Sequence, residues 1–378
     1  MSKILMVLNE SRFFLSHRLP IARKASALGY EVVIVAKDTG EGKEIEAMGF
    51  RFIDLPVNPT GMNLSEEFTT FHFLARLYKE ENPSIIHHIG LKYILWGSLA
   101  AKLSGRRNVV NAVCGLGGLF NGDKLSMTAK GILYCLRFSC RRDDIYIFQN
   151  TDDRDIMLNY KVLKENQVRM TNGSGINLLE YKYKRSTSGD KIKVIFTGRL
   201  VKEKGICDFI DTADMLRADY DNKAQFVICG RLTPNKTGVT KEYMDKHCDG
   251  KYIRWLGERN DIEHLLEESH VMLFPSYYRE GIPKSLIEAC AKGLPIITCD
   301  SVGCKETVED GVNGFLVKPR SPSDIADKLR ILIDNNELRE KMGIESRRIA
   351  ETKFSVYDVV NVHMNIYNDF LNSTQDLM

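Results

Sequence analysis

Short apolar runs alternate with segments of helical period along nearly the whole chain, and this alternation limits the possible folds more than any other feature. The first runs are Ile4 to Leu8 and, after a helical segment at 19–28, Glu31 to Ala36 with its core VVIVA. Uninterrupted apolar runs of this length are typical of strands buried on both faces of a parallel sheet. The alternation therefore predicts an α/β fold of strand–helix–strand units. Further strands are expected near 51–55, 84–88, 108–113, 144–149 and 167–171.

A second series of the same kind begins at Lys191. Between the two series, residues 178–190 (LLEYKYKRSTSGD) lack apolar period and have the composition of a solvated linker. The second series predicts strands near 192–197, 224–229, 252–255, 270–274, 295–299 and 314–317. Helices are expected near 205–217, 261–267, 283–292, 321–334 and 337–350.

A chain of 378 residues exceeds one ordinary core and suits two domains of roughly 150–200 residues each. We expect Rossmann-like domains at 1–178 and 190–355, with a C-terminal helix near 356–372 that could pack back on the first domain. Such sheets bind ligands at the carboxyl ends of their strands. If the two sets of strand ends face each other, the active site lies in a cleft between the domains.

Composition excludes several classes of protein. Hydrophobic residues make up 43% and charged residues 27%, as in ordinary globular proteins, and the net charge of +3 gives no reason to expect a nucleic-acid partner. The apolar run at the N-terminus is too short for a signal peptide, and no run approaches a membrane span, so a cytoplasmic protein is expected. Neither the nine cysteines nor the eight histidines show metal-ligand spacing, so no bound metal is expected.

The segment EGIPKSLIE at 280–288 follows the apolar strand VMLFP. Pro283 suits the first position of a helix, and Gly281 allows close backbone approach to a ligand. The free N–H groups of the first turn would bind an anion or hydroxyls. Glu280 precedes the helix and Glu288 points back towards its start, so both carboxylates can serve one ligand. The alternative is that both are solvated charges at a helix end.

The segment FTGRLVKEKG places Gly198, Arg199 and Lys204 at a strand-to-helix turn. Two cations there suit a diphosphate, because Arg offers a planar fork and Lys a point charge. The alternative is that they are surface charges on a loop.

Together these segments resemble the retaining family 4 of glycosyltransferases, which has the GT-B architecture of two facing Rossmann-like domains. The resemblance covers essentially the whole second domain. It rests on G-R-L-x-x-x-K-G at 198–205, FVICG at 226–230, LGERNDI at 256–262, PSYYREGIPKSLIEACAKGLPII at 275–297 and VGCKETVEDGVNGFLVKP at 302–319.

The resemblance implies a role for each matching residue. Arg199 and Lys204 would neutralise the diphosphate of a nucleotide-sugar donor in place of a divalent metal, and Glu280 would hold donor sugar hydroxyls. Glu288 would bind the ribose, and Arg259 would lie near the base. The backbone of Gly198, Gly281, Ile282 and Pro283 would cradle sugar and phosphate. The implied enzyme is a retaining, metal-independent hexosyltransferase without a cofactor, acting by front-side attack.

The first domain departs from the family pattern, because NESRFFLSHRLPIA at 9–22 replaces its usual glycine pair. It resembles instead a bacterial subgroup that elongates polyprenyl-diphosphate-linked glycans, such as capsule and O-antigen precursors. The shared features are HRLPIA at 17–22, GYEVVIVA at 29–36, GMN at 61–63 and CGLGGLF at 114–120. This resemblance implies a glycan or lipid-linked acceptor and an acceptor-side first domain.

Several residues of the first domain are candidates for ligand contacts. Gly117 and Gly118, in a turn with Gly115, could bring backbone to the donor diphosphate, or they form a plain turn. Acceptor-side candidates are His17, Arg18, His87 and Lys92, although a histidine at a sheet end, such as His87 or His88, is commonly structural.

Residues 124–142 (KLSMTAKGILYCLRFSCRR) mix apolar and basic residues and carry no acid. Such a helix can lie at the inner face of the cell membrane, with Met127, Ile132, Leu133, Leu136 and Phe138 among the cations, or pack on its own sheet.

Two rival functions remain open, a third is excluded, and the base, sugar and acceptor are not fixed. A nicotinamide dehydrogenase would need a G-x-G-x-x-G turn, which neither VLNESRFF nor FTGRLVKEKG supplies. A nucleotide-sugar epimerase or hydrolase would share the fold and act without an acceptor. A non-catalytic nucleotide-sugar-binding protein would show no turnover.

Overall fold

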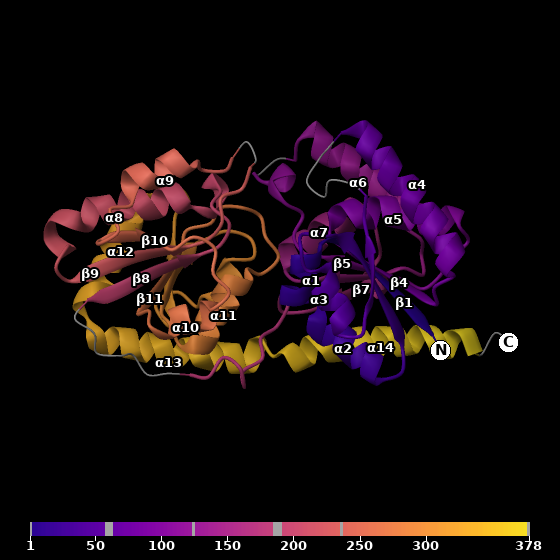
Figure 1. Cartoon of the computed structure of the whole chain (residues 1–378). Coiled ribbons are helices and arrows are strands. Elements are labelled where there is room, and N and C mark those ends of the chain that lie inside the picture. The colour runs from indigo at the N-terminus through magenta and orange to yellow at the C-terminus, as the bar shows by residue number, and fades with distance from the viewer. Residues whose placement is uncertain (1, 57–62, 123–124, 184–190, 235–236, 376–378) are drawn as a thin grey trace. The chain divides into compact units, whose positions relative to one another are not determined.

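The computed structural model describes residues 2–56, 63–122, 125–183, 191–234 and 237–375. The chain divides into two compact units (Figure 1). The first comprises Met1–Ser174 and Val356–Met378, and the second comprises Gly175–Ser355. The first unit thus ends a few residues before the predicted boundary at 178. Part of the predicted linker, residues 184–190, lies outside the described residues.

Among the described residues, the first unit contains one parallel sheet of seven strands in the order β3-β2-β1-β4-β5-β6-β7. The central strand β1 shows why apolar residues run without interruption. Its side chains alternate between two cores, with Ile4, Met6 and Leu8 on one face and Leu5 and Val7 on the other. The strands are β1 (Lys3–Glu10), β2 (Glu31–Lys37), β3 (Arg51–Asp54), β4 (Ile85–Ile89), β5 (Val109–Val113), β6 (Ile145–Phe148) and β7 (Val168–Met170).

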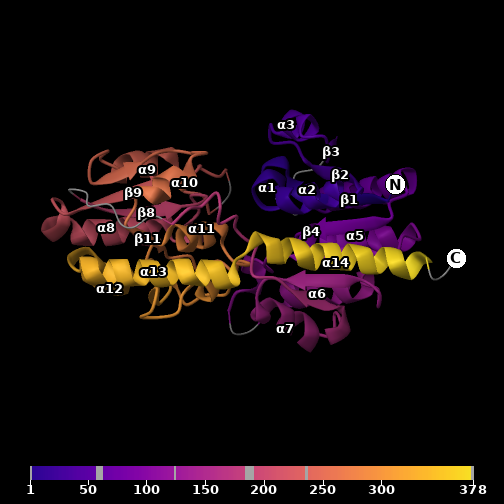
Figure 2. The same ribbon diagram turned by 90° about the horizontal axis from the view of Figure 1, so that it is seen from below.

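Helices cover both faces of this sheet (Figures 1 and 2). The C-terminal helix α14 packs beside α2, and its Tyr367 lies in the same core as Ile4 and Met6. The α-helices of the unit are α1 (Ser11–His17), α2 (Leu19–Ala27), α3 (Gly42–Ala47), α4 (Leu64–Glu81), α5 (Leu91–Leu103), α6 (Met127–Ser139), α7 (Thr151–Asn159) and α14 (Val356–Gln375). Short 3₁₀ turns are η1 (Gly118–Phe120) and η2 (Glu165–Gln167).

The described part of the second unit forms a parallel sheet of six strands in the order β10-β9-β8-β11-β12-β13. Its strands are β8 (Ile192–Thr197), β9 (Ala224–Cys229), β10 (Ile253–Trp255), β11 (Val271–Phe274), β12 (Ile296–Cys299) and β13 (Gly314–Val317). Its helices are α8 (Ile206–Tyr220), α9 (Lys241–His247), α10 (Ile262–Glu267), α11 (Lys284–Lys292), α12 (Pro322–Asp334) and α13 (Asn336–Lys353), with 3₁₀ turns η3 (Lys202–Lys204) and η4 (Lys305–Thr307).

The predicted fold class, two Rossmann-like α/β domains, is confirmed. Each strand predicted from the sequence is found within two residues of its expected bounds. Both sheets follow the doubly wound strand order 3-2-1-4-5-6, and the first adds β7 at its edge. The sequence analysis named no helix at α1, which directly follows β1, or at α3, α4, α5, α7 and α9.

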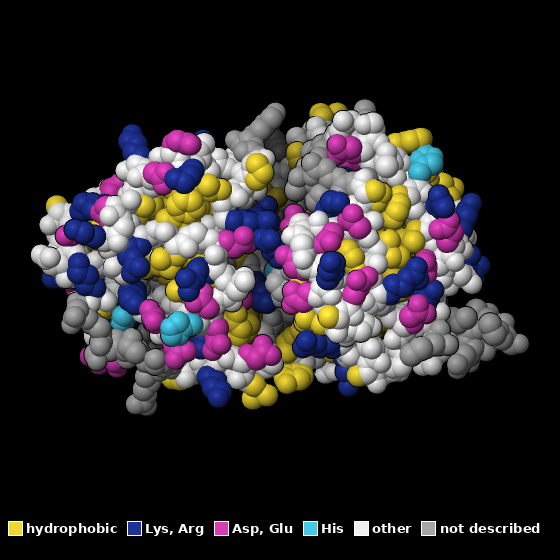
Figure 3. All heavy atoms as spheres, in the orientation of Figure 1, with side chains coloured by type: hydrophobic (Ala, Val, Ile, Leu, Met, Phe, Trp, Pro, Cys, Tyr) yellow, Lys and Arg dark blue, Asp and Glu magenta, His cyan; other side chains and the backbone are white. Residues whose placement is uncertain are grey.

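The visible surface carries charges of both signs. In Figure 3, Lys and Arg side chains are interspersed with Asp and Glu on each unit. This agrees with 53 basic against 50 acidic residues in the chain. A binding site for an anion must therefore be a local arrangement of cations and backbone donors.

Candidate active site

All predicted donor-site residues of the second unit except Arg259 lie beyond the carboxyl ends of its two central strands, β8 and β11. Strand β8 ends at Thr197, and Gly198 and Arg199 follow it directly. Strand β11 ends at Phe274 and leads through Ser276 to Glu280. Because β8 and β11 are hydrogen-bonded neighbours, their following loops emerge side by side. Ligands bind at this edge in doubly wound sheets.

Backbone contacts join the two loops. The carbonyl oxygen of Glu203 accepts from the N–H groups of Tyr277 at 3.0 Å and Tyr278 at 3.1 Å. Gly205 has a φ of +80°, and a Cβ at this position would collide with the carbonyl group of Pro275. A glycine is therefore required where η3 meets α8, both for the left-handed backbone and for the close approach of β11.

This packing brings Lys204 and Glu280 together. Lys204 Nζ lies 3.2 Å from Glu280 Oε2, and the side chains are only 13% and 15% exposed. Ser276 Oγ lies 3.3 Å from Glu280 Oε1, and Lys204 Nζ lies 5.4 Å from the ring centroid of Phe274. Sequence analysis assigned Lys204 to a diphosphate and Glu280 to a sugar. In the structure the two side chains form one ion pair that is largely shielded from solvent. Sequence analysis missed Ser276, although it lies within the quoted PSYYREG segment.

Arg199 differs from Lys204, because its side chain is exposed. No hydrogen bond or ion pair joins the Arg199 side chain to any other described residue. The preceding Gly198 is fixed by its N–H bond to the carbonyl of Cys229 at 3.0 Å, and its own carbonyl packs on Gly230. The backbone is therefore held while the guanidinium can turn towards an anion.

The start of α11 supplies backbone donors at the same edge. Gly281, Ile282 and Pro283 are buried, and the N–H groups of Leu286 and Ile287 both bond to the Pro283 carbonyl. Pro283 is therefore the N-cap and not, as predicted, the first helical residue. Gly303 packs so closely on the Gly281 carbonyl that a Cβ at 303 would collide with it. This contact fixes the turn before the helix.

Glu288 lies inside α11 and is held by a different set of partners. Tyr181 Oη donates to its Oε1 at 3.0 Å, and Lys284 Nζ lies at 3.8 Å from the same oxygen. Burial raises the pKa of Glu288, while Lys284 and Tyr181 oppose that shift. Sequence analysis missed Tyr181, because residues 178–183 have the composition of a linker. In the structure Tyr181 packs on the core of the second unit.

Arg259 lies after β10 and is exposed. Its Nε donates to Asp261 Oδ1 at 2.8 Å. A ligand that contacts Arg259 would share the guanidinium with this carboxylate.

In the first unit, the predicted glycine turn follows β5. Gly115 has a φ of +106° and Gly117 a φ of +79°, so both occupy backbone conformations that favour glycine. Asp153 Oδ2 accepts from the Leu116 N–H at 3.2 Å, and Asn150 bonds to the same oxygen at 3.1 Å. Sequence analysis missed Asp153, whose only signal is its place in the first turn of α7.

The acceptor-side candidates have unequal access to the surface. His17 is half-buried and stacks on Phe13, while Lys92 Nζ pairs with Glu67 Oε1 at 2.8 Å. Arg18 is 2% exposed. The structure corrects the placement of His87, because its side chain is fully buried and its Nδ1 lies 2.7 Å from Tyr367 Oη, inside the core.

His88 is also a core residue. Its Nε2 lies 2.9 Å from Tyr78 Oη and its Nδ1 lies 2.8 Å from Asn111 Oδ1. Burial lowers the pKa of His88 to about 4, with the Asn111 bond acting in the opposite direction. The β4 strand is buried on both faces, so neither histidine reaches the sheet edge.

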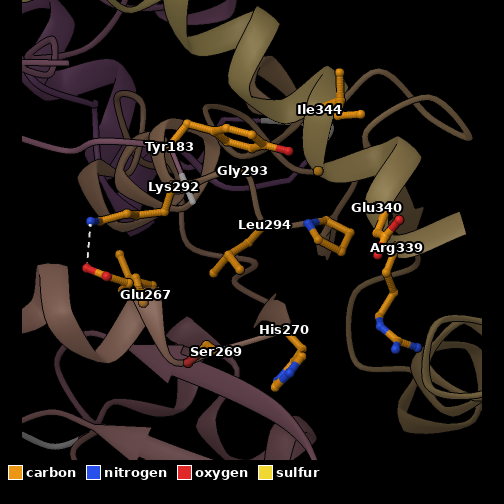
Figure 4. Close-up of a pocket in the computed structure, with 13 residues that line it drawn as sticks. Tyr183, Glu267, Ser269, His270, Lys292, Gly293, Leu294, Arg339, Glu340 and Ile344 are labelled. Atoms are coloured by element: carbon orange, nitrogen blue, oxygen red, sulfur yellow. Dashed lines mark hydrogen bonds and ion pairs between the residues drawn. The ribbon is translucent and has the colours of Figure 1, made fainter. Parts of the chain in front are cut away.

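A cavity of about 360 Å³ in the second unit lies away from these residues (Figure 4). It borders the amino ends of β11 and β12, where His270 and Pro295 lie. Lys292, 1% exposed in its side chain, pairs there with Glu267 at 3.3 Å, as the dashed line shows. The cavity is thus at the sheet edge opposite to the candidate site.

No group of three or more His, Cys, Asp and Glu residues in the described ranges is placed to hold a metal ion. No helix built from the described residues has both the length and the apolar character needed to cross a membrane.

Known proteins resemble both units. Residues 179–349 match the family of glycosyl transferases group 1, and residues 3–150 match the glycosyl transferase 4-like family. The *Campylobacter jejuni* N,N'-diacetylbacillosaminyl-diphospho-undecaprenol alpha-1,3-N-acetylgalactosaminyltransferase is 26% identical over 92% of this chain and 98% of its own length. The *Staphylococcus aureus* capsular polysaccharide biosynthesis glycosyltransferase CapM is 26% identical over 91% of each chain.

A solved structure shows the same fold over nearly the whole chain. The glycosyltransferase from *Rickettsia africae* superposes with a TM-score of 0.76 at 17% identity, covering 98% of each chain. The two family matches account for both Rossmann-like units, and the site residues lie at the ligand-binding edge of the second. The chain therefore belongs to the glycosyltransferases of GT-B fold, with a glycosyl transferase 4-like domain followed by a group 1 domain.

Proposed function

We propose that this glycosyltransferase moves a sugar from a nucleotide diphosphate to a glycan or polyprenyl-diphosphate-linked acceptor, with retention of configuration and without a metal ion. The observation that carries the proposal is the Lys204–Glu280 pair, 3.2 Å apart at the carboxyl edge of the second sheet. It unites a cation suited to a leaving diphosphate with a carboxylate suited to sugar hydroxyls.

The donor occupies the second domain in this proposal. Arg199 and Lys204 neutralise the diphosphate, with backbone contacts from Gly198 and from Gly281 to Pro283. Glu280 accepts hydrogen bonds from the sugar. Glu288 binds the ribose and Arg259 lies near the base, which we propose to be uracil. Gly117 and Gly118 of the first domain add backbone contacts to a diphosphate.

Retention follows from the proposed front-side attack, in which Lys204 and Arg199 stabilise the leaving group. As the glycosidic bond breaks, charge develops on the diphosphate, and preorganised cations stabilise that state. The leaving diphosphate oxygen then takes the proton of the acceptor hydroxyl, which attacks on the same face. The relative from *Campylobacter jejuni* is named for an alpha linkage, the product of a retaining enzyme with an α-linked donor.

The acceptor and the sugar are proposed from the relatives. One is named for transfer of N-acetylgalactosamine to a diphospho-undecaprenol glycan and the other for capsule synthesis. An N-acetylhexosamine or a hexose as the sugar, and a lipid-linked precursor of a surface polysaccharide as the acceptor, fit both. His17, Arg18 and Lys92 remain acceptor-side candidates.

A lipid-linked acceptor requires access to the inner face of the cell membrane, where we place this otherwise cytoplasmic protein. Helix α6 exposes Met127 (83%), Tyr134 (73%) and Phe138 (68%), and Lys130 and Arg137 lie on the same exposed side. Leu133 and Leu136 do not join this surface, because they are buried in the core, and Ile132 is partly buried against it. Lys124, named in the same segment, lies outside the described residues.

Vesicle sedimentation tests this contact. Tyr134→Ser/Phe138→Ser and Lys130→Glu/Arg137→Glu should each weaken binding to anionic vesicles, the second pair in a salt-dependent way. Arg141 is left unchanged, because its Nη2 bonds to the Lys102 carbonyl at 2.7 Å. Equal sedimentation of all variants, with anionic and neutral lipid alike, would refute the membrane contact.

Transfer itself is tested with purified protein, a panel of nucleotide sugars and a short polyprenyl-diphosphate acceptor. The expected product carries a new glycosidic bond whose anomeric configuration, read from its proton coupling constant, equals that of the donor. An inverted product contradicts the retaining mechanism. Donor epimerisation or hydrolysis that no acceptor suppresses favours the epimerase or hydrolase instead, and binding without turnover favours a non-catalytic protein.

A further inference from the structure

Arg18 is a buried cation at the carboxyl edge of the first sheet. It lies between α1, which follows the end of β1, and α2. Its side chain is 2% exposed, and its Nη2 donates to Cys114 Sγ at 2.8 Å. Its Nε is buried and has no hydrogen-bond partner in the described part of the chain. Cys114 comes directly after β5, so Arg18 reaches the edge at which such sheets bind ligands.

No described carboxylate forms an ion pair with Arg18. The titratable groups that face it are His87 from β4 and His363 and Tyr367 from α14. Burial lowers the pKa of His363 to about 3 and that of His87 well below its usual value, and it raises the pKa of Tyr367. All three groups are therefore uncharged near neutral pH. A buried cation without a counter-charge is unfavourable, so an anion at this position would be bound strongly.

The glycine turn 115–118 begins directly after Cys114, the residue that Arg18 contacts. Gly115 and Gly117 have positive φ angles, and Gly118 is exposed. Successive backbone N–H groups in such conformations form concave sites for anions, and the missing side chains allow close approach. Asp153 fixes the turn through the Leu116 N–H. The N-terminus of α2, which no side chain caps, adds partial positive charge beside Arg18.

We propose that Arg18 and the glycine turn 115–118 form a phosphate-binding site that belongs to the first domain alone. Its ligand is a diphosphate, the group that the proposed donor and the proposed lipid-linked acceptor share. The inference rests on the proposed function at one point only, namely which molecule, the donor or the acceptor, carries the diphosphate. Arg18 and the turn then act together, instead of as separate acceptor-side and donor-side contacts.

Binding of inorganic pyrophosphate to the full chain tests the site without any transfer reaction. The titrations use Arg199→Met/Lys204→Met as the background, because the donor site of the second domain should also bind pyrophosphate. In this background Arg18→Met should lower the affinity at least tenfold, and Arg18→Lys should restore part of it. Arg23→Met is the matched control, since Arg23 is an exposed cation of the same helix α2 and should have no effect.

Thermal unfolding separates this role from a structural one. Without ligand, Arg18→Met should have a Tm equal to or above that of the parent, because it removes an uncompensated buried charge. It should also lose the rise in Tm that pyrophosphate gives the parent. A folded Arg18→Met protein that binds pyrophosphate like its parent would overturn the proposal, as would a lower Tm with unchanged pyrophosphate binding.

Kinetics in the otherwise wild-type chain identify the diphosphate carrier. A raised KM for the polyprenyl-diphosphate acceptor alone assigns the site to the acceptor, and a raised KM for the donor alone assigns it to the donor. Wild-type KM values for both substrates in Arg18→Met contradict the site. If the wild-type chain transfers no sugar at all, the proposed function fails while the pyrophosphate titrations still decide the site.

Discussion

Lys204→Ala should lower kcat about a hundredfold. The Lys204 ammonium lies 3.2 Å from the Glu280 carboxylate, and both side chains are at least 85% buried, so the site is shielded from bulk water. Two unit charges about 4 Å apart interact by about 4 kcal/mol at an effective dielectric constant near 20. The diphosphate gains roughly one negative charge as the glycosidic bond breaks, and Lys204 attracts that charge. If about two thirds of the 4 kcal/mol interaction acts on the transition state, the barrier falls by about 2.7 kcal/mol, which corresponds to about a hundredfold in rate.

The loss of stability in the same variant should be too small to explain this effect. Lys204 and Glu280 are neither fully exposed nor fully buried, so breaking the pair should cost between about 1 and 3 kcal/mol. Domains of this size are typically stable by about 5–15 kcal/mol, so the variant remains folded at 25 °C. Ser276 Oγ, 3.3 Å from Glu280 Oε1, continues to solvate the remaining carboxylate.

The assay is steady-state transfer with saturating donor and acceptor, with folding checked by circular dichroism. Lys202→Ala is the matched control, because Lys202 is an exposed cation of the same η3 turn and does not contact Glu280. It should leave kcat within about twofold of wild type, as surface charges usually do. A Lys204→Ala enzyme within about threefold of wild type, or an equal loss in Lys202→Ala, would refute the assignment of Lys204 to the leaving group.

Four further predictions concern Arg199, Glu280, metal dependence and the buried His88. Arg199→Ala should lower turnover at least about a hundredfold without changing Tm, since Arg199 contacts no other described side chain; wild-type turnover would exclude it from the site. Glu280→Gln should impair transfer and sugar selection while calorimetry with nucleoside diphosphate barely changes; lost diphosphate affinity with normal transfer of bound donor would contradict its role. Transfer should survive excess chelator if, as proposed, Arg199 and Lys204 take the electrostatic role of a metal; a complete loss restored by magnesium or manganese would overturn this. The pKa of His88 is lowered from about 6.5 to about 4, so its contribution to stability is complete above pH 6.5. This contribution, about 3 kcal/mol, is lost as the pH falls to 4. His88→Gln should therefore flatten the fall of Tm over that pH range, and an unchanged slope would contradict this.

The fold was predictable from the sequence because strands buried on both faces of a parallel sheet consist of consecutive apolar residues. The inner strands are short, nearly continuous apolar runs, as Leu5 and Met6 of β1 illustrate by facing different cores. Helix α1 shows no such pattern, since it has seven residues and no side-chain cap at Glu10. The sequence analysis placed Pro283 at the first helical position, whereas it is the N-cap residue. Proline is compatible with both positions, so the residue type alone does not decide between them.

The site was predictable only in part. Local motifs identified Lys204 and Glu280 separately, but their contact spans 76 residues and depends on the pairing of β8 with β11. The same limit applies to Tyr181, whose bond to Glu288 spans 107 residues. His87 was misplaced because two polar residues in IIHHI suggested a sheet edge, whereas the side chain lies in the core, where Tyr367 of α14 bonds to its Nδ1. Sequence spacing does not reveal such partners.

The two cations assigned to the leaving group are held in different ways, and this difference explains why the site would need both. Lys204 is held by protein contacts with Glu280, the Phe274 ring and the neighbouring Gly205. Its charge therefore acts on the transition state without further ordering, but Glu280 already balances part of that charge. Arg199 carries no such partner among the described residues, so its full charge is available to the diphosphate. It must, however, lose rotamer freedom on binding, at a cost of about 1–2 kcal/mol. In the proposed site, Lys204 is ordered but partly neutralised, whereas Arg199 is mobile but carries its full charge. Each cation thus supplies at the diphosphate what the other lacks.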